Sequence, residues 1–352
     1  MLVLIIKNFI TYDLKKLILL LFIPLVFACS SDDELASIEF NNSKSFVFVA
    51  CEGNFGASNG AIYYISNSGD VSSVENVGDV VQSLEVYNDK LFVIINNSHK
   101  IIAYDINENG LSLPGIEIST NESSPREMVI INNSLYFTNW NSNDVKKLDL
   151  FNYVISDFTS FDGKPESIIY ENEKLFVAIQ MNEDYSDSNK IYQIGVESGL
   201  IEKEWNVGYG PTSIIKNNNQ VYVANTYYDE NFNAFYGSSR VNVLTDEVLI
   251  NNYSTGVVCG GSVHKYNSNI FRSSQGGIIS LDNNLDFVLE TKIGDEDPLQ
   301  LYSSEIINNK VYFGITNYTD INLVKIYNAN NEIEGIFEVG LFPGDFAYWQ
   351  EN

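Results

Sequence analysis

Cysteine, histidine and basic residues are scarce in this sequence. It has 3 cysteines and 2 histidines, and its 46 acidic residues far outnumber its 20 basic ones. The cysteines form no CxxC pair, so a zinc site built from thiolates is not supported. The acidic excess, a formal net charge of -26, disfavours nucleic acid and anionic lipid as partners. Such a charge fits a soluble, exported body.

Several motifs are also missing. The sequence has no GxSxG nucleophile elbow and no HExxH helix, so these two kinds of hydrolase chemistry are not supported. Its long apolar run near the start is shorter than the roughly 20 residues that a membrane-spanning helix needs. Beyond that run no stretch has convincing helical periodicity, and short strand-like segments dominate. These patterns predict an all-β fold.

The start of the chain differs from the rest. Lys15 and Lys16 precede an unbroken apolar run, Leu17–Ala28, which ends directly before Cys29. A basic segment, an apolar segment and a small residue before the cut predict a secretory signal over residues 1–28. The last residues of the run resemble a bacterial lipobox, although Phe27 is bulkier than usual. The resemblance implies lipidation of Cys29; the alternative is an ordinary signal peptide that is cut elsewhere.

An acidic segment, Ser30–Glu34, follows Cys29. It resembles the surface-export tether of Bacteroidota lipoproteins, and the alternative is a plain solvated linker. We therefore expect residues 29–44 to be a lipidated tether and the protein to be held in the outer membrane by its lipid, facing the cell exterior. Several acyl chains on one cysteine would anchor it firmly.

A strand pattern recurs along the remaining chain. Its copies lie 40 to 49 residues apart, and most follow a polar turn such as Asn88–Lys90. Asn, Asp and Ser tolerate the backbone of tight hairpins, so each turn joins two antiparallel strands. Four short strands per repeat predict a seven-bladed β-propeller over residues 45–352. The copies are Phe46–Val49, Leu91–Ile94, Leu135–Phe137, Leu175–Val177, Val221–Val223, Ile270–Phe271 and Val311–Phe313.

A second motif, often containing proline, opens the first strand of each blade. Examples are Gly208–Ile214 and Ser124–Met128. A last copy, Gly340–Tyr348, has no hairpin partner after it, and the blade that begins at Phe46 lacks this opening strand. We therefore predict that the C-terminal strand completes the first blade and closes the ring, which leaves no exposed sheet edge.

These repeats resemble the YncE-like propellers with proline-containing repeats. The segment Glu52–Gly56, with Asn59 and Gly60 after it, resembles the Asn-Glu-Gly-x-x-Gly opening of a Bacteroidota lipoprotein family, with Cys51 in place of the usual Asn. Members of that family are often encoded beside TonB-dependent outer-membrane transporters. One branch captures vitamin B12 and passes it to the transporter. The resemblance implies a similar capture protein, with a cobalamin-like nutrient as the transported ligand and no resident cofactor.

The loops between second and third strands share one face with the entries to the first strands, and propellers use such faces for recognition. We expect long loops over residues 180–189 and 226–239, the second with five aromatic residues including Phe232. Exposed aromatics beside amides suit a large, mostly neutral ligand. The alternative is that they pack within their own loops. The candidate ligand-binding residues are Glu52, Asn54, Phe55, His99, Trp140, Tyr185, Tyr227, Tyr228, Phe235, Tyr236, Arg272 and Tyr318.

Other functions stay open. The same face could bind a protein or a glycan without catalysis. A propeller lyase or lactonase would need histidines, and the chain offers His99, a conceivable axial cobalt ligand, and His264 on a first strand. The acidic run Asp295–Asp297 lacks the spaced oxygen pattern of a calcium loop, so we expect a solvated turn and no metal site. Cys51 and Cys259 are either paired or buried and inert.

Overall fold

Tight hairpins that contain asparagine join the first and second strands of blades 2 to 7. The computed structural model describes residues 43–256, 261–319 and 321–351. In six blades the turn between the first and second strands has an asparagine with φ between 46° and 53°, the left-handed region that Asn tolerates well. This confirms the hairpins expected from the polar turns. The six residues are Asn88, Asn132, Asn172, Asn218, Asn267 and Asn308.

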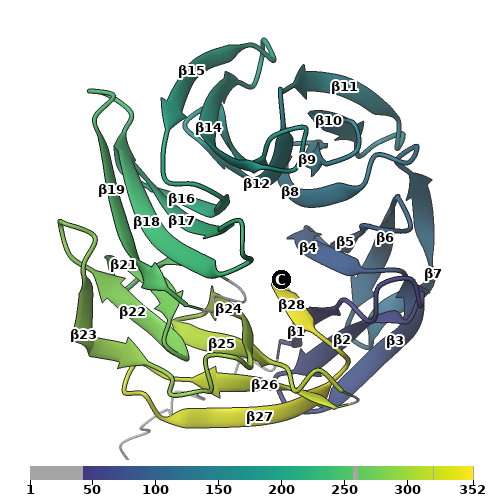
Figure 1. Ribbon diagram of the computed structural model, residues 1–352. Coiled ribbons are helices and arrows are strands. Elements are labelled where there is room, and N and C mark those ends of the chain that lie inside the picture. Colours follow the sequence, from purple (N-terminus) through teal and green to yellow (C-terminus); the bar gives the residue numbers. More distant parts are fainter. Residues whose placement is uncertain (1–42, 257–260, 320, 352) are drawn as a thin grey trace, which may run out of the picture. The chain divides into compact units, whose positions relative to one another are not determined.

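The strands form seven antiparallel sheets of four strands, arranged as blades around an axis (Figure 1). Blade 1 holds β28 (Pro343–Gln350), β1 (Ser45–Cys51), β2 (Gly60–Ser66) and β3 (Val71–Gly78). Blade 2 holds β4 (Val81–Tyr87), β5 (Lys90–Ile95), β6 (Lys100–Asn107) and β7 (Gly110–Ser119). Blade 3 holds β8 (Pro125–Ile131), β9 (Ser134–Asn139), β10 (Asp144–Asp149) and β11 (Ile155–Ser160).

The other four blades repeat this order, with the inner strand named first. Blade 4 holds β12 (Lys164–Glu171), β13 (Lys174–Met181), β14 (Asp187–Gly195) and β15 (Ile201–Asn206). Blade 5 holds β16 (Pro211–Asn217), β17 (Gln220–Tyr228), β18 (Ala234–Asn242) and β19 (Val248–Thr255). Blade 6 holds β20 (Val263–Tyr266), β21 (Asn269–Ser274), β22 (Gly277–Leu281) and β23 (Phe287–Ile293). Blade 7 holds β24 (Leu301–Ile307), β25 (Lys310–Ile315), β26 (Asn322–Tyr327) and β27 (Ile333–Val339).

The C-terminal strand closes the ring, as the sequence predicted. β28 pairs with β1 along its length, and Phe48 lies opposite Ala347. The rings of Phe46 and Trp349 stack at 5.7 Å between centroids. The Nε1 of Trp349 also donates a hydrogen bond to Asp89 of blade 2, at 2.9 Å. Blade 1 is therefore built from both ends of the propeller segment.

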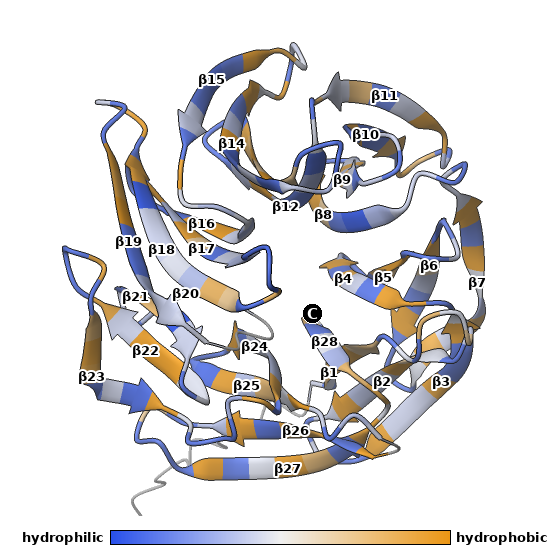
Figure 2. Ribbon diagram, in the orientation of Figure 1, coloured by the Kyte–Doolittle hydropathy of each residue, from blue (hydrophilic) through white to orange (hydrophobic). Residues whose placement is uncertain are grey.

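Apolar residues of the second and third strands fill the spaces between blades. Figure 2 shows hydrophobic segments alternating with polar ones along these strands. Phe48, Phe92, Phe137, Phe176 and Phe313, all on second strands, are among the largest fully buried side chains. Each blade thus covers its faces with its neighbours, which is how a propeller forms a core.

Two loops are shorter than expected. β17 and β18 continue their pairing to Tyr227 opposite Phe235 and Tyr228 opposite Ala234, so the blade 5 loop is only residues 229–233. Aromatic cross-strand pairs stabilise a hairpin, which explains the extension. Four of the aromatics assigned to this loop are therefore strand residues, and only Phe232 is at the tip. The blade 4 loop is likewise reduced to residues 182–186.

Several expectations fall on residues outside the described ranges. These are the signal over residues 1–28, the lipidation of Cys29, and most of the tether. Cys51 is buried, but Cys259 lies outside the described residues, so their pairing stays open. Within residues 43–256, 261–319 and 321–351, no helix is long and apolar enough to cross a membrane.

Candidate functional site

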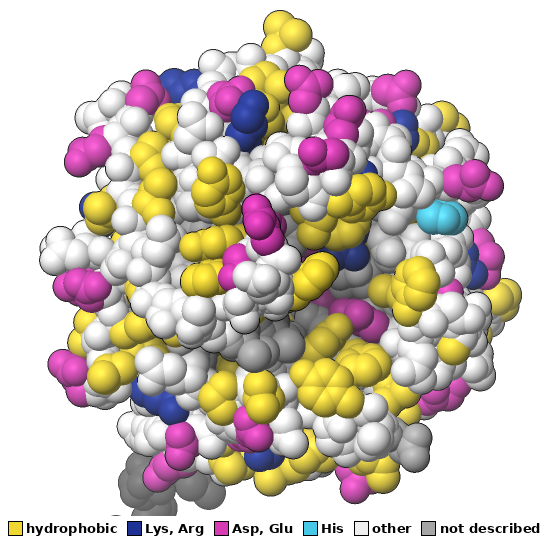
Figure 3. Space-filling model, viewed as in Figure 1, with side chains coloured by type: hydrophobic (Ala, Val, Ile, Leu, Met, Phe, Trp, Pro, Cys, Tyr) yellow, Lys and Arg dark blue, Asp and Glu magenta, His cyan; other side chains and the backbone are white. Residues whose placement is uncertain are grey.

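A pocket of about 650 Å³ opens on the face that carries the loops between second and third strands. Its lining comes from blades 1, 2, 3 and 7, close to the propeller axis. Figure 3 views this face, where hydrophobic side chains gather beside a hollow near the middle. We call it the loop-face pocket. Its lining residues are Glu52, Gly53, Phe55, Val80, Gln82, Asn96, Asn97, His99, Ser124, Arg126, Trp140, Asn141, Tyr302 and Phe342.

The loop that carries Phe55 is fastened to blade 2. Both carboxylate oxygens of Asp79 accept the main-chain N–H of Gly56, at 3.0 Å each. The Nδ2 of Asn97 donates to the same carboxylate at 2.6 Å. Phe55, with 78% of its surface exposed, is thus presented at the pocket rim by a loop whose backbone is held in place. Its neighbour Asn54 donates its N–H to the side chain of Asn59.

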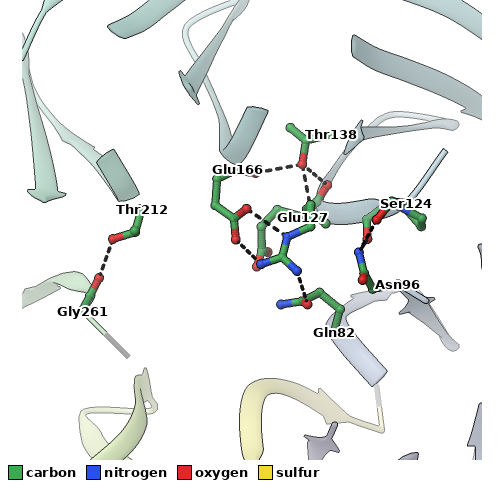
Figure 4. A network of polar contacts seen from close by, with 10 residues as sticks. Gln82, Asn96, Ser124, Glu127, Thr138, Glu166, Thr212 and Gly261 are labelled. Carbon is green, nitrogen blue, oxygen red and sulfur yellow. Dashed lines mark hydrogen bonds and ion pairs between the residues drawn. The ribbon is translucent and has the colours of Figure 1, made fainter. Parts of the chain in front are cut away.

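A paired arginine forms the floor of the pocket. The Nε and NH2 groups of Arg126 donate to the two carboxylate oxygens of Glu166, at 2.9 and 2.6 Å, and NH1 donates to Gln82 at 2.7 Å. Figure 4 shows Gln82 and Glu166 on opposite sides of this guanidinium group. The indole ring of Trp140 lies over it, 4.4 Å from centroid to Cζ. The pocket floor is therefore a neutralised ion pair covered by an aromatic ring.

The geometry of His99 decides its chemistry. Its Nδ1 accepts the main-chain N–H of Ser124 at 3.2 Å. In the neutral ring the proton must then be on Nε2, so that nitrogen donates hydrogen bonds. Coordination of cobalt by Nε2 would require the loss of this arrangement. His99 is therefore better suited to hydrogen-bond a ligand than to bind a metal.

Carboxyl groups gather on the inner strands around the axis. Partial burial raises the pKa of Glu85 and of Glu305 to about 7, and that of Asp345 to about 6. Burial, together with the charge of Asp345, also raises the pKa of Glu127. Burial raises the pKa of Glu52 in the pocket, where the hydroxyl of Tyr302 donates to its carboxylate. These groups disfavour anions at the axis.

Of the candidate ligand-binding residues, four line the pocket: Glu52, Phe55, His99 and Trp140. Asn54 is next to two of them in sequence. Tyr185 lies against Lys164, whose Nζ is 4.2 Å from its ring and donates to the carbonyl of Trp140. Tyr318 packs edge-on against Phe342 of the pocket wall, at 6.0 Å between centroids. Tyr185 and Tyr318 thus lie just behind the residues that line the pocket.

The other five candidates lie away from the pocket. Tyr227 and Phe235 of blade 5 stack at 5.4 Å, Tyr228 is exposed, and Tyr236 packs against Tyr253. Arg272 is fully buried between blades 5 and 6. The sequence analysis had assigned the four aromatic residues to a loop of the binding face and had listed Arg272 with them as a candidate.

Sequence reasoning missed Gln82, Arg126, Tyr302 and Phe342. The first three are each the second residue of an inner strand, directly after Val81, Pro125 and Leu301. At this position Arg126 of blade 3 hydrogen-bonds Gln82 of blade 2, so it links neighbouring inner strands. An alignment of the seven repeats would have marked it as a variable, mostly polar position.

Among the described residues, no three His, Cys, Asp or Glu side chains are grouped so that they could hold a metal ion. In the acidic run, Asp295 pairs with Lys292 at 2.9 Å and Glu296 with Lys325 at 2.7 Å. Asp295 is exposed, as expected for a solvated turn, whereas the side chain of Glu296 is largely buried in its ion pair.

Comparisons with known proteins bear on the fold alone. No family model and no curated protein matches the chain. Similar solved structures include apo AztD from Citrobacter koseri, with a TM-score of 0.57 and 10% identity over 88% of this chain and 98% of that one. A putative 6-phosphogluconolactonase from Bacteroides fragilis has a TM-score of 0.61 and 12% identity, covering 88% and 99%. A hypothetical selenium-binding protein from Sulfolobus tokodaii has a TM-score of 0.64 and 9% identity, covering 88% and 93%. The chain is thus similar in fold to proteins with different descriptions.

Proposed function

We propose that the chain is a surface-displayed binding protein that captures a small nutrient in the loop-face pocket and passes it to a TonB-dependent outer-membrane transporter. The observation that carries this proposal is the pocket itself. Its size falls within the range of small-molecule sites, about 300–1,000 Å³. Rings of Phe55 and Trp140 offer apolar contact, and Gln82 and Asn97 offer amides. The predicted lipid anchor at Cys29 would keep this pocket at the outer membrane.

The chemistry of the pocket favours a neutral ligand that is rich in hydrogen-bonding groups. The positive charge of Arg126 is balanced by Glu166, so no anionic ligand is needed to neutralise the pocket floor. A ligand with amide carbonyl groups would accept a hydrogen bond from the Nε2–H of His99 at the pocket wall. A cobalamin-like molecule is the leading candidate, with one edge in the pocket because a corrinoid exceeds the pocket in size.

Isothermal titration with cyanocobalamin tests the ligand. The chain from Ser30 onward, without its predicted signal and lipidation site, is titrated at micromolar concentration. We expect binding that Trp140→Ala weakens at least tenfold, which corresponds to about 1.4 kcal/mol. Phe232→Ala removes an exposed ring outside the pocket and is the matched control, with unchanged affinity. No heat with the parent chain would reject cobalamin, and equal loss in both variants would reject the pocket.

Co-purification tests the transfer step. In cells that express the lipidated chain, crosslinking should recover a TonB-dependent transporter with it. The variant Cys29→Ser, which should lack the lipid, serves as the control. Recovery of the same transporter at the same yield with both forms would argue against capture at the membrane.

A second function is favoured by one observation. The stacked pair Tyr227 and Phe235, with the exposed Tyr228 and Phe232 beyond it, forms an aromatic platform on blade 5 that is separate from the pocket. Such a platform suits a protein or glycan partner. If Phe232→Ala abolishes binding on a glycan or cell-surface array while Trp140→Ala does not, the chain is an interaction module. Neither function requires catalysis, and the likeness to a putative lactonase is one of fold.

A further inference from the structure

Left-handed backbone gathers around the loop-face pocket. Four of its lining residues other than glycine have φ between 51° and 61°. At such φ values the Cβ atom crowds the main chain, so most residues other than glycine avoid them. Residues held in such conformations often belong to ligand-binding sites, where the surrounding structure keeps them in place. The four residues are Val80, His99, Ser124 and Phe342.

Three of these four residues share one position of the repeat. In blades 1, 2, 3 and 5 the residue directly before the inner strand has φ between 56° and 61°. Its carbonyl oxygen accepts a main-chain N–H from near the end of the second strand, as Val80 does from Asn96 and Gly210 from Thr226, at 2.8 Å each. The equivalent bonds of blades 1 and 3 measure 3.0 Å. Main-chain bonding therefore holds this conformation, whatever the side chain.

The residue type at this position follows the pocket. Blade 5 has Gly210, which adopts φ of +61° without strain and is not part of the pocket lining. The three blades whose residue lines the pocket have a side chain there instead. Within residues 43–256, 261–319 and 321–351, Val80 is the one β-branched residue with positive φ. A branched Cβ suits this conformation worst, so the fold alone does not explain a valine here.

Two neighbouring valines differ in what their side chains serve. Val77 and Val80 are equally buried, each with 8% of its surface exposed. Val77, near the end of β3, belongs to the apolar cluster that joins blades 1 and 2. Val80, directly before β4, lines the loop-face pocket together with Gln82 and Asn96. The methyl groups of Val80 thus offer apolar surface to the pocket.

Phe342 holds the matching position in blade 1. Its ring packs against the rings of Tyr302 and Tyr318, at 5.5 and 6.0 Å between centroids. Its main-chain N–H donates to the Oδ1 of Asn322 at 2.9 Å. Backbone and ring are both held, so this part of the pocket wall is ordered before any ligand arrives. A wall that is already ordered loses little conformational entropy on binding.

We propose that Val80 and Phe342 are fixed apolar contacts of the loop-face pocket, against which a rigid apolar ring of the ligand is positioned. The strained backbone of Val80 keeps its methyl groups at the pocket in place of a residue that the fold would accept more easily. The proposal rests on the proposed nutrient capture, and it names the part of the ligand that these residues recognise.

A matched pair of glycine variants tests the strain. In Val80→Gly the relief of strain should offset much of the lost burial, so its Tm should lie within about 2 °C of the parent value. Val77→Gly removes the same side chain from the core, where no strain is relieved, and should unfold at least about 5 °C lower. Equal losses of Tm in the two variants would make Val80 an ordinary core residue and overturn the proposal.

Isothermal titration with cyanocobalamin tests the contact. We expect Val80→Gly to bind at least tenfold more weakly than the parent chain, and Val77→Gly to keep the parent affinity. Val80→Thr keeps the shape and the branched Cβ and exchanges a methyl group for a hydroxyl group, so it should bind about threefold more weakly. Parent affinity in Val80→Gly would overturn the proposal.

A second probe separates the contact from the identity of the nutrient. If the parent chain does not bind cyanocobalamin, that ligand is rejected and indole, a small neutral ring, takes its place. In NMR spectra of a chain with labelled valine methyl groups, indole should shift the signals of Val80 and leave those of Val77 unchanged. Such shifts would retain Val80 as a contact without cobalamin. If neither probe affects Val80, the proposal is wrong.

Discussion

The carboxylate of Asp345 accepts the main-chain N–H of Leu84 at 2.7 Å, across 261 positions of the sequence. This bond joins β28, the last strand, to the inner strand of blade 2. The same relationship recurs where the Oγ of Ser167 accepts the N–H of Ile214, at 3.3 Å. Inner strands are thus linked around the axis by side chains that reach the main chain of the next blade.

Deletion of residues 340–352 should therefore open the ring. Blade 1 would lose its inner strand, β1 would expose an edge, and the stack of Phe46 on Trp349 would vanish. We expect a large loss of Tm or the formation of oligomers, measured by calorimetry and light scattering. The single change Asp345→Ala should cost far less, because the strand pairing survives. A truncated chain that stays monomeric with its original Tm would contradict closure by β28.

Stability should fall as the pH rises from mildly acidic to neutral. The carboxyls of Glu85, Glu305 and Asp345 have higher pKa values in the folded chain than the ordinary 3.8 to 4.5, so the folded state binds more protons up to about pH 7. The stabilisation is present at about pH 4 and is lost by about pH 7, at most about 3 kcal/mol for each glutamate.

Denaturant unfolding at a series of pH values measures this slope. The variants Glu85→Gln and Glu305→Gln should flatten it, and Glu171→Gln, which alters an exposed glutamate at the end of β12, should leave it unchanged. A slope of the same size in all four chains would show that these inner-strand carboxyls are not its source.

The fold and the candidate site were unequally predictable from sequence. Hairpin turns such as Asn88–Lys90 are local signals, and the absence of an opening strand before Phe46 indicated ring closure. The pocket depends on contacts between four blades, and no local pattern brings Tyr302 beside Glu52. Arg272 was predicted to be a ligand contact. Its repeat position, shared with Val93 and Val177, would have placed it in the core.

Glu166→Gln should destabilise the chain by about 2–4 kcal/mol, because Arg126 would keep a largely buried charge without its carboxylate. Glu202→Gln, which breaks the more exposed pair with Lys174, should cost less than about 1 kcal/mol. Urea unfolding of both variants measures the difference. Similar small losses would mean that the Arg126 pair is screened like a surface pair.

Two glycines with positive φ form a matched test of packing. A Cβ at Gly210, where φ is +61°, would lie 1.8 Å from the carbonyl oxygen of Thr226, whereas one at Gly56, with φ +79°, meets nothing within 4 Å. Gly56→Ala should cost about 1 kcal/mol, from backbone strain alone. Gly210→Ala should cost about 3 kcal/mol or more, because the backbone must move. Equal Tm values for the two variants would rule out the close approach at Gly210.

The thiol of Cys51 should resist alkylation in the folded chain. It is almost fully buried, and burial raises its pKa, so little reactive thiolate is present. Iodoacetamide treatment followed by peptide mass spectrometry should find Cys51 unmodified under native conditions and alkylated in guanidinium chloride. A Cys51 that stays unmodified in guanidinium until a reductant is added would point to a disulfide.

Closure of blade 1 by β28 also has a consequence for the order of folding. β1 is the first propeller strand to leave the ribosome, and its inner partner β28 is the last. Blades 2 to 7 are each contiguous in sequence and can form as the chain emerges. Blade 1 must wait for the final residues, so a stalled chain or one clipped at its C-terminus would carry an unfinished sheet edge at β1.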